Sequence, residues 1–288
     1  MKNQKKTLEE AFVKIVEERP NLTAKEITQI EIDRQIEDLK QQKENNKKEK
    51  EEKKAERKAK KETKKEKKEL KSYLLTPMGY VFIGLFLIMF SLFFYISVYQ
   101  YEVVNFEYIF YNGATILTFI TPVLTMRMFA EERKTGTEQL ILTSPRSLTS
   151  VVLGKFVAAL IIVLVTEILT FMYYIILSFF GEPSLKVALV TLFGFFLLAA
   201  GYISFGMFAS SITENQIVAC VLPIGVFIVM MFLPNINEAF SFFSLINMFD
   251  KFPNGVIALD EIVAFVSFAI LFITLTIIIL QRRKTTKQ

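Results

Sequence analysis

The sequence predicts an all-α membrane protein with six transmembrane helices, preceded by a charged tail that is helical or partly disordered. Its 288 residues are 52% hydrophobic and include 29 Phe. Residues 1–71 nevertheless hold 23 of the 34 Lys and Arg residues and 17 of the 29 Asp and Glu residues. This first part is too charged to fold around a core of its own, and the rest is too apolar to be water-soluble. We therefore divide the chain into a cytoplasmic tail (1–69) and a transmembrane domain (70–288).

The composition excludes several kinds of catalysis. The chain has no His, which removes an imidazole base and the usual zinc ligands. Its single Cys, Cys220, permits no internal disulfide. We expect no catalytic residue, no metal site and no cofactor in this chain.

The tail contains two sequence signals for helix starts. Thr7 with Glu10, and Thr23 with Glu26, match the capping box that opens many helices. Residues 47–71 carry 14 basic and 7 acidic side chains, which favours contact with anionic lipid headgroups. Interleaved Glu residues and the lack of aromatic residues in this stretch argue against nucleic-acid binding. We expect a solvated helical or disordered arm, with no removable signal peptide before it.

Six apolar runs are long enough to cross a bilayer, which takes about 20 helical residues. They are Pro77–Val98, Phe110–Met128, Val151–Phe180, Val187–Ser210, Ile217–Phe232 and Ile262–Leu280. Thr76 and Pro77 form a sharp helix start, so Leu70–Leu75 is predicted to be a separate elbow helix at the membrane surface. Small residues in the fourth run indicate close helix packing. The mixed segment Pro234–Asp260 is too interrupted to span, and we expect short re-entrant helices in the outer leaflet.

The distribution of basic residues predicts the orientation. With the tail in the cytoplasm, nine Lys and Arg residues of the membrane domain lie on that side and two, Lys186 and Lys251, lie outside. This arrangement predicts a multi-pass protein of the cytoplasmic membrane with both termini in the cytoplasm.

The loop between the second and third runs combines charges with an apolar turn. Gly136 permits a reversal of the chain, and Thr137 and Glu138 favour a short helix that Pro145 ends. Its apolar residues are Leu140, Ile141 and Leu142, exposed where polar residues would be preferred. The residues alone leave two interpretations open, a docking surface for another protein or a loop folded back on its own bundle.

Two polar features lie inside the predicted membrane region. Glu167 is near the middle of the third run, where a carboxylate is costly and often functional. The second run carries Thr115, Thr118, Thr121 and Thr125 on one face. We regard all five residues as candidates for a translocation path. For Glu167 we favour a neutral side chain that hydrogen-bonds a neighbouring hydroxyl, because its face carries no second charge.

A resemblance decides between the two interpretations of the loop. The run Met126 to Pro145, which contains E-E-R-K-T-G-T-E-Q-L, resembles the coupling-helix region of ABC-2-type ABC transporter permeases. It is most similar to the half-size branch linked to gliding motility and copper-enzyme maturation. The elbow at Thr76–Gly79 and the turn Ser210–Gln216 support the resemblance, which covers Leu70 to Leu280. Residues 1–69 have no counterpart in the family pattern.

The resemblance implies a permease subunit that is not itself an enzyme, with ATP hydrolysis on a separate ATPase subunit. It implies a dimer of permeases, each contacting a cytoplasmic ABC ATPase subunit that binds ATP and Mg²⁺ and drives export. The implied ATPase-docking residues are Glu131, Glu132, Arg133, Gly136, Thr137, Glu138, Leu140, Ile141 and Leu142, with a second contact at Thr213, Glu214 and Asn215. No G-x-x-x-x-G-K-[ST] sequence occurs, since Met207 follows the correctly spaced Gly201 and Gly206. The alternatives are an ion-coupled transporter, for which paired intramembrane charges are missing, or a membrane scaffold without transport.

Overall fold

The computed structural model describes residues 77–100, 106–139 and 147–286. The predicted tail, the elbow helix and the apolar turn at 140–142 lie outside the described residues. Within them, the structure is helical, and no strand occurs.

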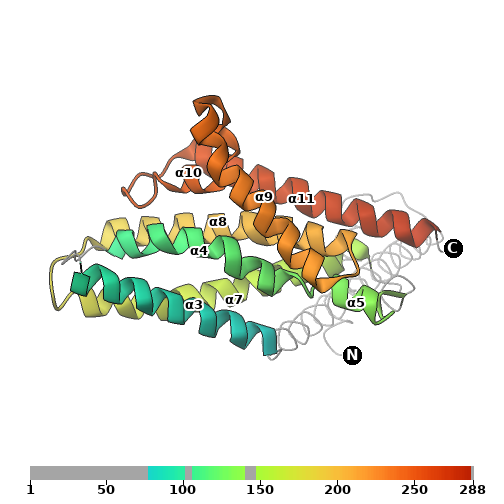
Figure 1. Cartoon of the computed structure of the whole chain (residues 1–288), viewed down its shortest axis with the longest axis horizontal. Helices are drawn as coiled ribbons and strands as arrows, with labels where there is room; N and C mark the ends of the chain where they lie inside the picture. The colour runs from blue at the N-terminus through green and yellow to red at the C-terminus, as the bar shows by residue number, and fades with distance from the viewer. Residues whose placement is uncertain (1–76, 101–105, 140–146, 287–288) are drawn as a thin grey trace, which may run out of the picture. The chain divides into compact units, whose positions relative to one another are not determined.

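Six long helices confirm the predicted number of spans. They are α3 (Pro77–Tyr95), α4 (Phe106–Thr125), α7 (Leu148–Leu177), α8 (Leu185–Ile212), α9 (Gln216–Ile236) and α11 (Leu259–Thr286). Each belongs to a helical segment long and apolar enough to cross a membrane. The chain passes back and forth between two ends of the bundle, and α9 crosses it obliquely (Figure 1).

Helix α8 lies at the centre of the bundle. It packs against α4, α7, α9 and α11, and most of its residues are buried. Glycines allow close approach to α8 at two places, by α4 and by the segment after α10: a Cβ on Gly206 would lie 2.2 Å from Thr125 Oγ1, and one on Gly194 would lie 2.3 Å from Phe252 Cγ. The small residues of this span therefore serve close packing, as predicted.

Buried aromatic rings fill the space between α3, α4 and α8. Phe90 and Phe110 have ring centroids 4.9 Å apart, and Phe110 and Phe195 have centroids 5.0 Å apart, both pairs edge to face. All three side chains are fully buried. Such pairs add about 0.5–1.5 kcal/mol each beyond the burial of their area.

Two short helices follow α9, in the segment predicted to be interrupted. They are a 3₁₀-helix at Glu238–Phe243 and α10 at Leu245–Phe249, which Ser244 caps by accepting a hydrogen bond from Asn247 N. At the other end of the bundle lie α5 (Ala130–Lys134) and the C-terminal end of α11 (Figure 1). We call these the α10 end and the α5 end.

Candidate functional site

The loop between α4 and α7 is held from the side by α8. Helix α5 has no side-chain cap of its own. Instead, Ser210 on α8 accepts hydrogen bonds from the backbone N–H groups of Phe129 and Ala130, each at 3.1 Å. Its hydroxyl also donates to the Met126 carbonyl at 3.0 Å. One α8 side chain thus replaces the missing cap and fixes where the loop leaves α4. The sequence did not indicate this role of Ser210, since a contact between residues about 80 positions apart leaves no local signal.

Two charged residues of α5 tie it to neighbouring elements. Glu132 forms an ion pair with Lys155 on α7, whose ammonium also lies 4.2 Å from the Phe129 ring centroid. Arg133 forms an ion pair with Glu214, with Nε 2.8 Å from Oε1, and donates to the Ile212 carbonyl at 2.7 Å. The two predicted contact regions, in this loop and in the α8–α9 turn, are therefore joined to each other.

A third ion pair joins the loop to the last helix. Glu138 is only 6% exposed, and its Oε1 accepts a hydrogen bond from Arg283 Nη1 at 3.0 Å. Arg283 also donates to the Ser211 carbonyl at 2.5 Å. The Glu138 carboxylate thus faces its own bundle, and the predicted role of Glu138 in docking stays a prediction.

Of the other predicted docking residues, some lie at the surface of the loop and three lie outside the described residues. Gly136 has a φ of +74°, which confirms the predicted reversal. Gly136 and Thr137 are exposed, and the Thr137 hydroxyl donates to the Glu132 carbonyl at 3.2 Å. Glu131 lies near Arg127, at 4.0 Å. Leu140, Ile141 and Leu142 lie outside the described residues.

The α8–α9 turn is built by its own polar residues. Thr213 Oγ1 accepts a hydrogen bond from Asn215 N at 3.1 Å, and Asn215 Oδ1 caps α9 by accepting from Ile217 N at 2.9 Å. Glu214 is left exposed at the tip, where it meets Arg133. The turn therefore presents a fixed shape next to α5.

Two of the four α4 threonines, Thr118 and Thr125, lie against helix α8. Thr118 Oγ1 lies 3.2 Å from the Tyr202 hydroxyl, and Thr125 bonds to carbonyls of its own helix. Thr121 is fully buried, and Thr115 is half-buried. Within this single chain the stripe is mostly packing surface, so its part in a translocation path stays a prediction.

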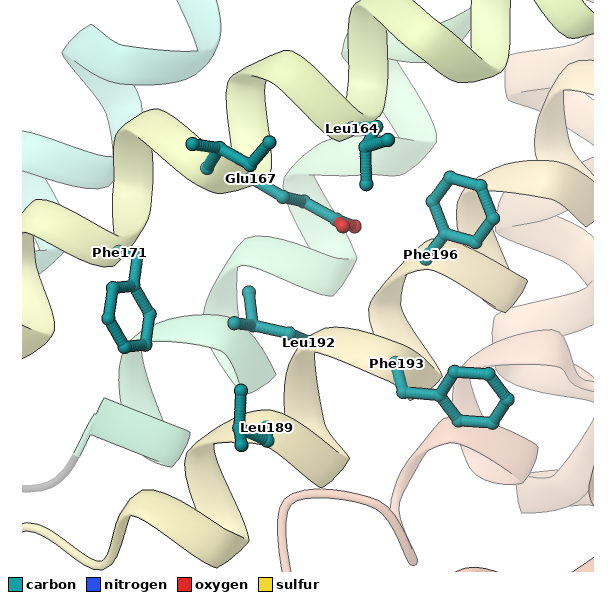
Figure 2. A pocket seen from close by; sticks show the side chains of 8 residues that line it. Leu164, Glu167, Phe171, Leu189, Leu192, Phe193 and Phe196 are labelled. Atoms are coloured by element: carbon teal, nitrogen blue, oxygen red, sulfur yellow. The ribbon is translucent and has the colours of Figure 1, made fainter.

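Glu167 lies elsewhere, in an apolar pocket between α7 and α8 (Figure 2). The side chain is 5% exposed, and its Oε1 has no hydrogen-bond partner among the described residues. The neighbouring Thr170 donates to the Glu167 backbone carbonyl at 2.8 Å rather than to the carboxylate. The predicted bridge from a neutral Glu167 carboxyl to a neighbouring hydroxyl is therefore absent from the described part of the chain. Nearby hydroxyls bond to backbone carbonyls instead, which are the closer acceptors in a helix.

Asp250, directly after α10, makes the stability of the protein depend on pH. Burial raises the pKa of its carboxyl from an ordinary 3.8 to about 6. Between these two values the folded protein binds more protons than the unfolded chain, so the free energy of unfolding falls as the pH rises from about 4 to about 6.

We expect Asp250→Asn to reduce this loss of stability, because the variant has no carboxyl to ionise. The measurement is the melting temperature of the purified protein in detergent at pH 5 and pH 7.5. Glu182→Gln, at an exposed position between α7 and α8, is the control and should keep the wild-type pH dependence. Equal pH dependence in Asp250→Asn and wild type would contradict the prediction.

The outer surface of the bundle defines the class of protein. Large apolar side chains are exposed on several long helices, including Ile168 on α7, Ile217 on α9 and Val263 on α11. A surface of this kind on six helices of membrane-crossing length belongs in lipid. The chain is therefore a multi-pass membrane protein.

Comparison with known families narrows this class. The family described as ABC-2 family transporter protein matches residues 1–284, and the chain belongs to it. No protein with curated annotation matches the chain. Members of this family are membrane components of ABC transporters, which implies an ABC ATPase subunit as partner. The match includes residues 1–69, so our expectation that the tail has no counterpart in the family was wrong.

Proposed function

We propose that this chain is the permease subunit of an ATP-driven exporter in the cytoplasmic membrane, with both termini in the cytoplasm. A separate ABC ATPase subunit binds the loop between α4 and α7 and the adjacent α8–α9 turn. Two permease subunits work together, and binding of ATP and Mg²⁺ by the ATPase subunits drives the transport cycle. The narrower similarity to the gliding-motility and copper-enzyme-maturation branch is part of this proposal.

The ion pairs of the loop are the observation that carries the proposal. They connect one short segment to α7, to the α8–α9 turn and to α11, through Glu132, Arg133 and Glu138. A displacement of this segment is therefore passed to several transmembrane helices at once, because each connection is a charged hydrogen bond. An ATPase subunit on a separate chain needs such a connection, because it can move the transmembrane helices only through the segment that it contacts.

The docking surface can be tested by cross-linking, since Cys220 is the only cysteine. In a Cys220→Ser background, Thr137→Cys places a thiol on the exposed part of the loop. Glu182→Cys places one at the exposed connection between α7 and α8 and is the matched control. With the cognate ATPase subunit and a thiol–amine cross-linker, we expect a covalent complex from Thr137→Cys alone. A complex from Glu182→Cys and none from Thr137→Cys would overturn the proposed docking surface.

We also expect Leu140→Asp to uncouple ATP hydrolysis from transport while the protein remains inserted. An apolar residue placed among charges is suited to burial by another protein, and a carboxylate there opposes that burial. The measurement is ATPase activity and transport by the reconstituted complex, with a loss of at least tenfold in transport per ATP hydrolysed. Leu140→Met keeps an apolar side chain and should retain coupling. Full coupling in Leu140→Asp would place the docking contact elsewhere.

A further inference from the structure

The pocket at Glu167 has the size and position of a ligand site reached from the bilayer. It encloses about 440 Å³, within the range of about 300–1,000 Å³ typical of small-molecule sites. Its walls are apolar except for Glu167, and the lining residues are Leu164, Glu167, Ile168, Phe171, Leu189, Leu192, Phe193 and Phe196. Ile168, Leu189 and Phe193 are exposed, so the pocket opens on the lipid-facing side of α7 and α8.

The carboxylate of Glu167 is aimed into this pocket. Figure 2 shows it extending from α7 into the space between Leu164 and Phe196. No Lys or Arg of the described residues pairs with it, and Oε1 has no hydrogen-bond partner there. An isolated carboxylate in apolar surroundings is costly, and a cation with an N–H donor would satisfy both its charge and its acceptor capacity.

The pocket lies deep in the predicted membrane region, far from water. Glu167 is ten residues from the end of α7, which at 1.5 Å per residue places it about 15 Å along the helix from the connection to α8. Phe193 and Phe196 are eight and eleven residues into α8, at a similar depth. About 15 Å is half the thickness of the hydrocarbon core, so a ligand at this depth must be largely apolar.

We propose that this pocket binds lipophilic tertiary amines, with the protonated nitrogen on Glu167 and the apolar part against the aromatic side chains. A tertiary ammonium has a single N–H donor, whereas a primary ammonium has three. The pocket has one polar group, and its carboxylate cannot reach all three diverging N–H bonds of a primary ammonium, whereas it satisfies the single donor of a tertiary one. The bound pair has no net charge, and the nearby Phe171, Phe193 and Phe196 provide rings that attract a cation. The proposal concerns binding by this chain and stands apart from the proposed coupling to an ATPase.

The test is equilibrium binding of labelled dimethyldodecylamine to the full chain in lipid nanodiscs, corrected for uptake by empty nanodiscs. We expect saturable binding at about one amine per chain. Dodecanol, which has the same alkyl chain but no charge, should bind at least tenfold more weakly. Glu167→Gln should weaken amine binding at least tenfold, whereas Glu182→Gln, the same change at an exposed position, should leave it unchanged.

A second variant keeps the test decisive if Glu167→Gln fails to fold. Ile168→Trp adds bulk at the exposed mouth of the pocket and leaves the carboxylate intact, so it should also reduce amine binding at least tenfold. Equal affinities for the amine and dodecanol, or undiminished amine binding in both pocket variants, would overturn the proposal. It would also be overturned if Glu167→Gln changed the oligomeric state while the wild type bound no amine above background. That result would identify the pocket as an interface with a second copy of the chain.

Discussion

Glu138→Lys is expected to abolish coupled transport and to destabilise the α5 end of the bundle. The change replaces a buried carboxylate by an ammonium directly opposite Arg283, whose guanidinium lies 3.0 Å from Glu138 Oε1. Removing one partner of a buried ion pair costs about 3–5 kcal/mol, and the reversed charge adds repulsion. We expect the free energy of unfolding to fall by about 3 kcal/mol and transport per ATP hydrolysed to fall at least tenfold.

The measurement combines thermal unfolding in detergent with ATPase and transport assays of the reconstituted complex. Glu182→Lys makes the same charge change at an exposed position and should be neutral. A double-mutant cycle of Glu138→Gln and Arg283→Gln then isolates the pair: the double variant should lose less than the sum of the single losses. Additive losses, or retained coupling in Glu138→Lys, would show that this ion pair does not transmit the movement.

Gly194→Ala is expected to have the largest effect on stability among conservative changes in the membrane domain. A Cβ at this position would lie 2.3 Å from Phe252 Cγ and 2.5 Å from Phe252 Cβ. Phe252 is fully buried, and its Cβ moves only with the backbone of the segment after α10. Overpacking of this kind costs about 1–3 kcal/mol. We expect a lower melting temperature and looser attachment of the segment after α10.

Gly225→Ala on α9 is the matched control, because nothing lies within 4 Å of a Cβ built there. Alanine is favoured over glycine inside a helix by up to about 1 kcal/mol, so this variant should be neutral or slightly more stable. The melting temperatures of the two variants in the same detergent provide the comparison. A Gly194→Ala protein as stable as Gly225→Ala would mean that Phe252 can move aside without cost.

The agreement between predicted and observed spans shows that the long helices follow from short stretches of sequence. The bounds predicted for the fourth span, Val187–Ser210, fall within the observed α8, Leu185–Ile212. The interrupted segment after the fifth span contains short helices, and their predicted re-entrant position in the outer leaflet stays a prediction. Such features follow from the composition of each segment, because a long apolar helix satisfies its own backbone hydrogen bonds wherever it lies.

The interaction partners in the candidate sites could not be predicted from short stretches of sequence. The charge pattern of the loop singled out Glu132, Arg133 and Glu138 as docking residues, which stays a prediction, and it could not indicate that their partners within the chain are Lys155, Glu214 and Arg283. Glu138 lies 145 residues before its partner. Helical periodicity likewise placed four threonines on one face of α4, but it could not indicate that this face packs against α8.

The sequence by itself determined the membrane class, the six spans and the segments that carry unusual polar residues, since each depends on the composition of a short stretch of chain. The tertiary structure alone decided that Ser210 caps α5, that Glu138 faces Arg283 and that Glu167 faces an apolar pocket. These outcomes depend on which helices become neighbours and how they are rotated. Both are decided by close packing between segments far apart in the chain, and no single segment contains that information.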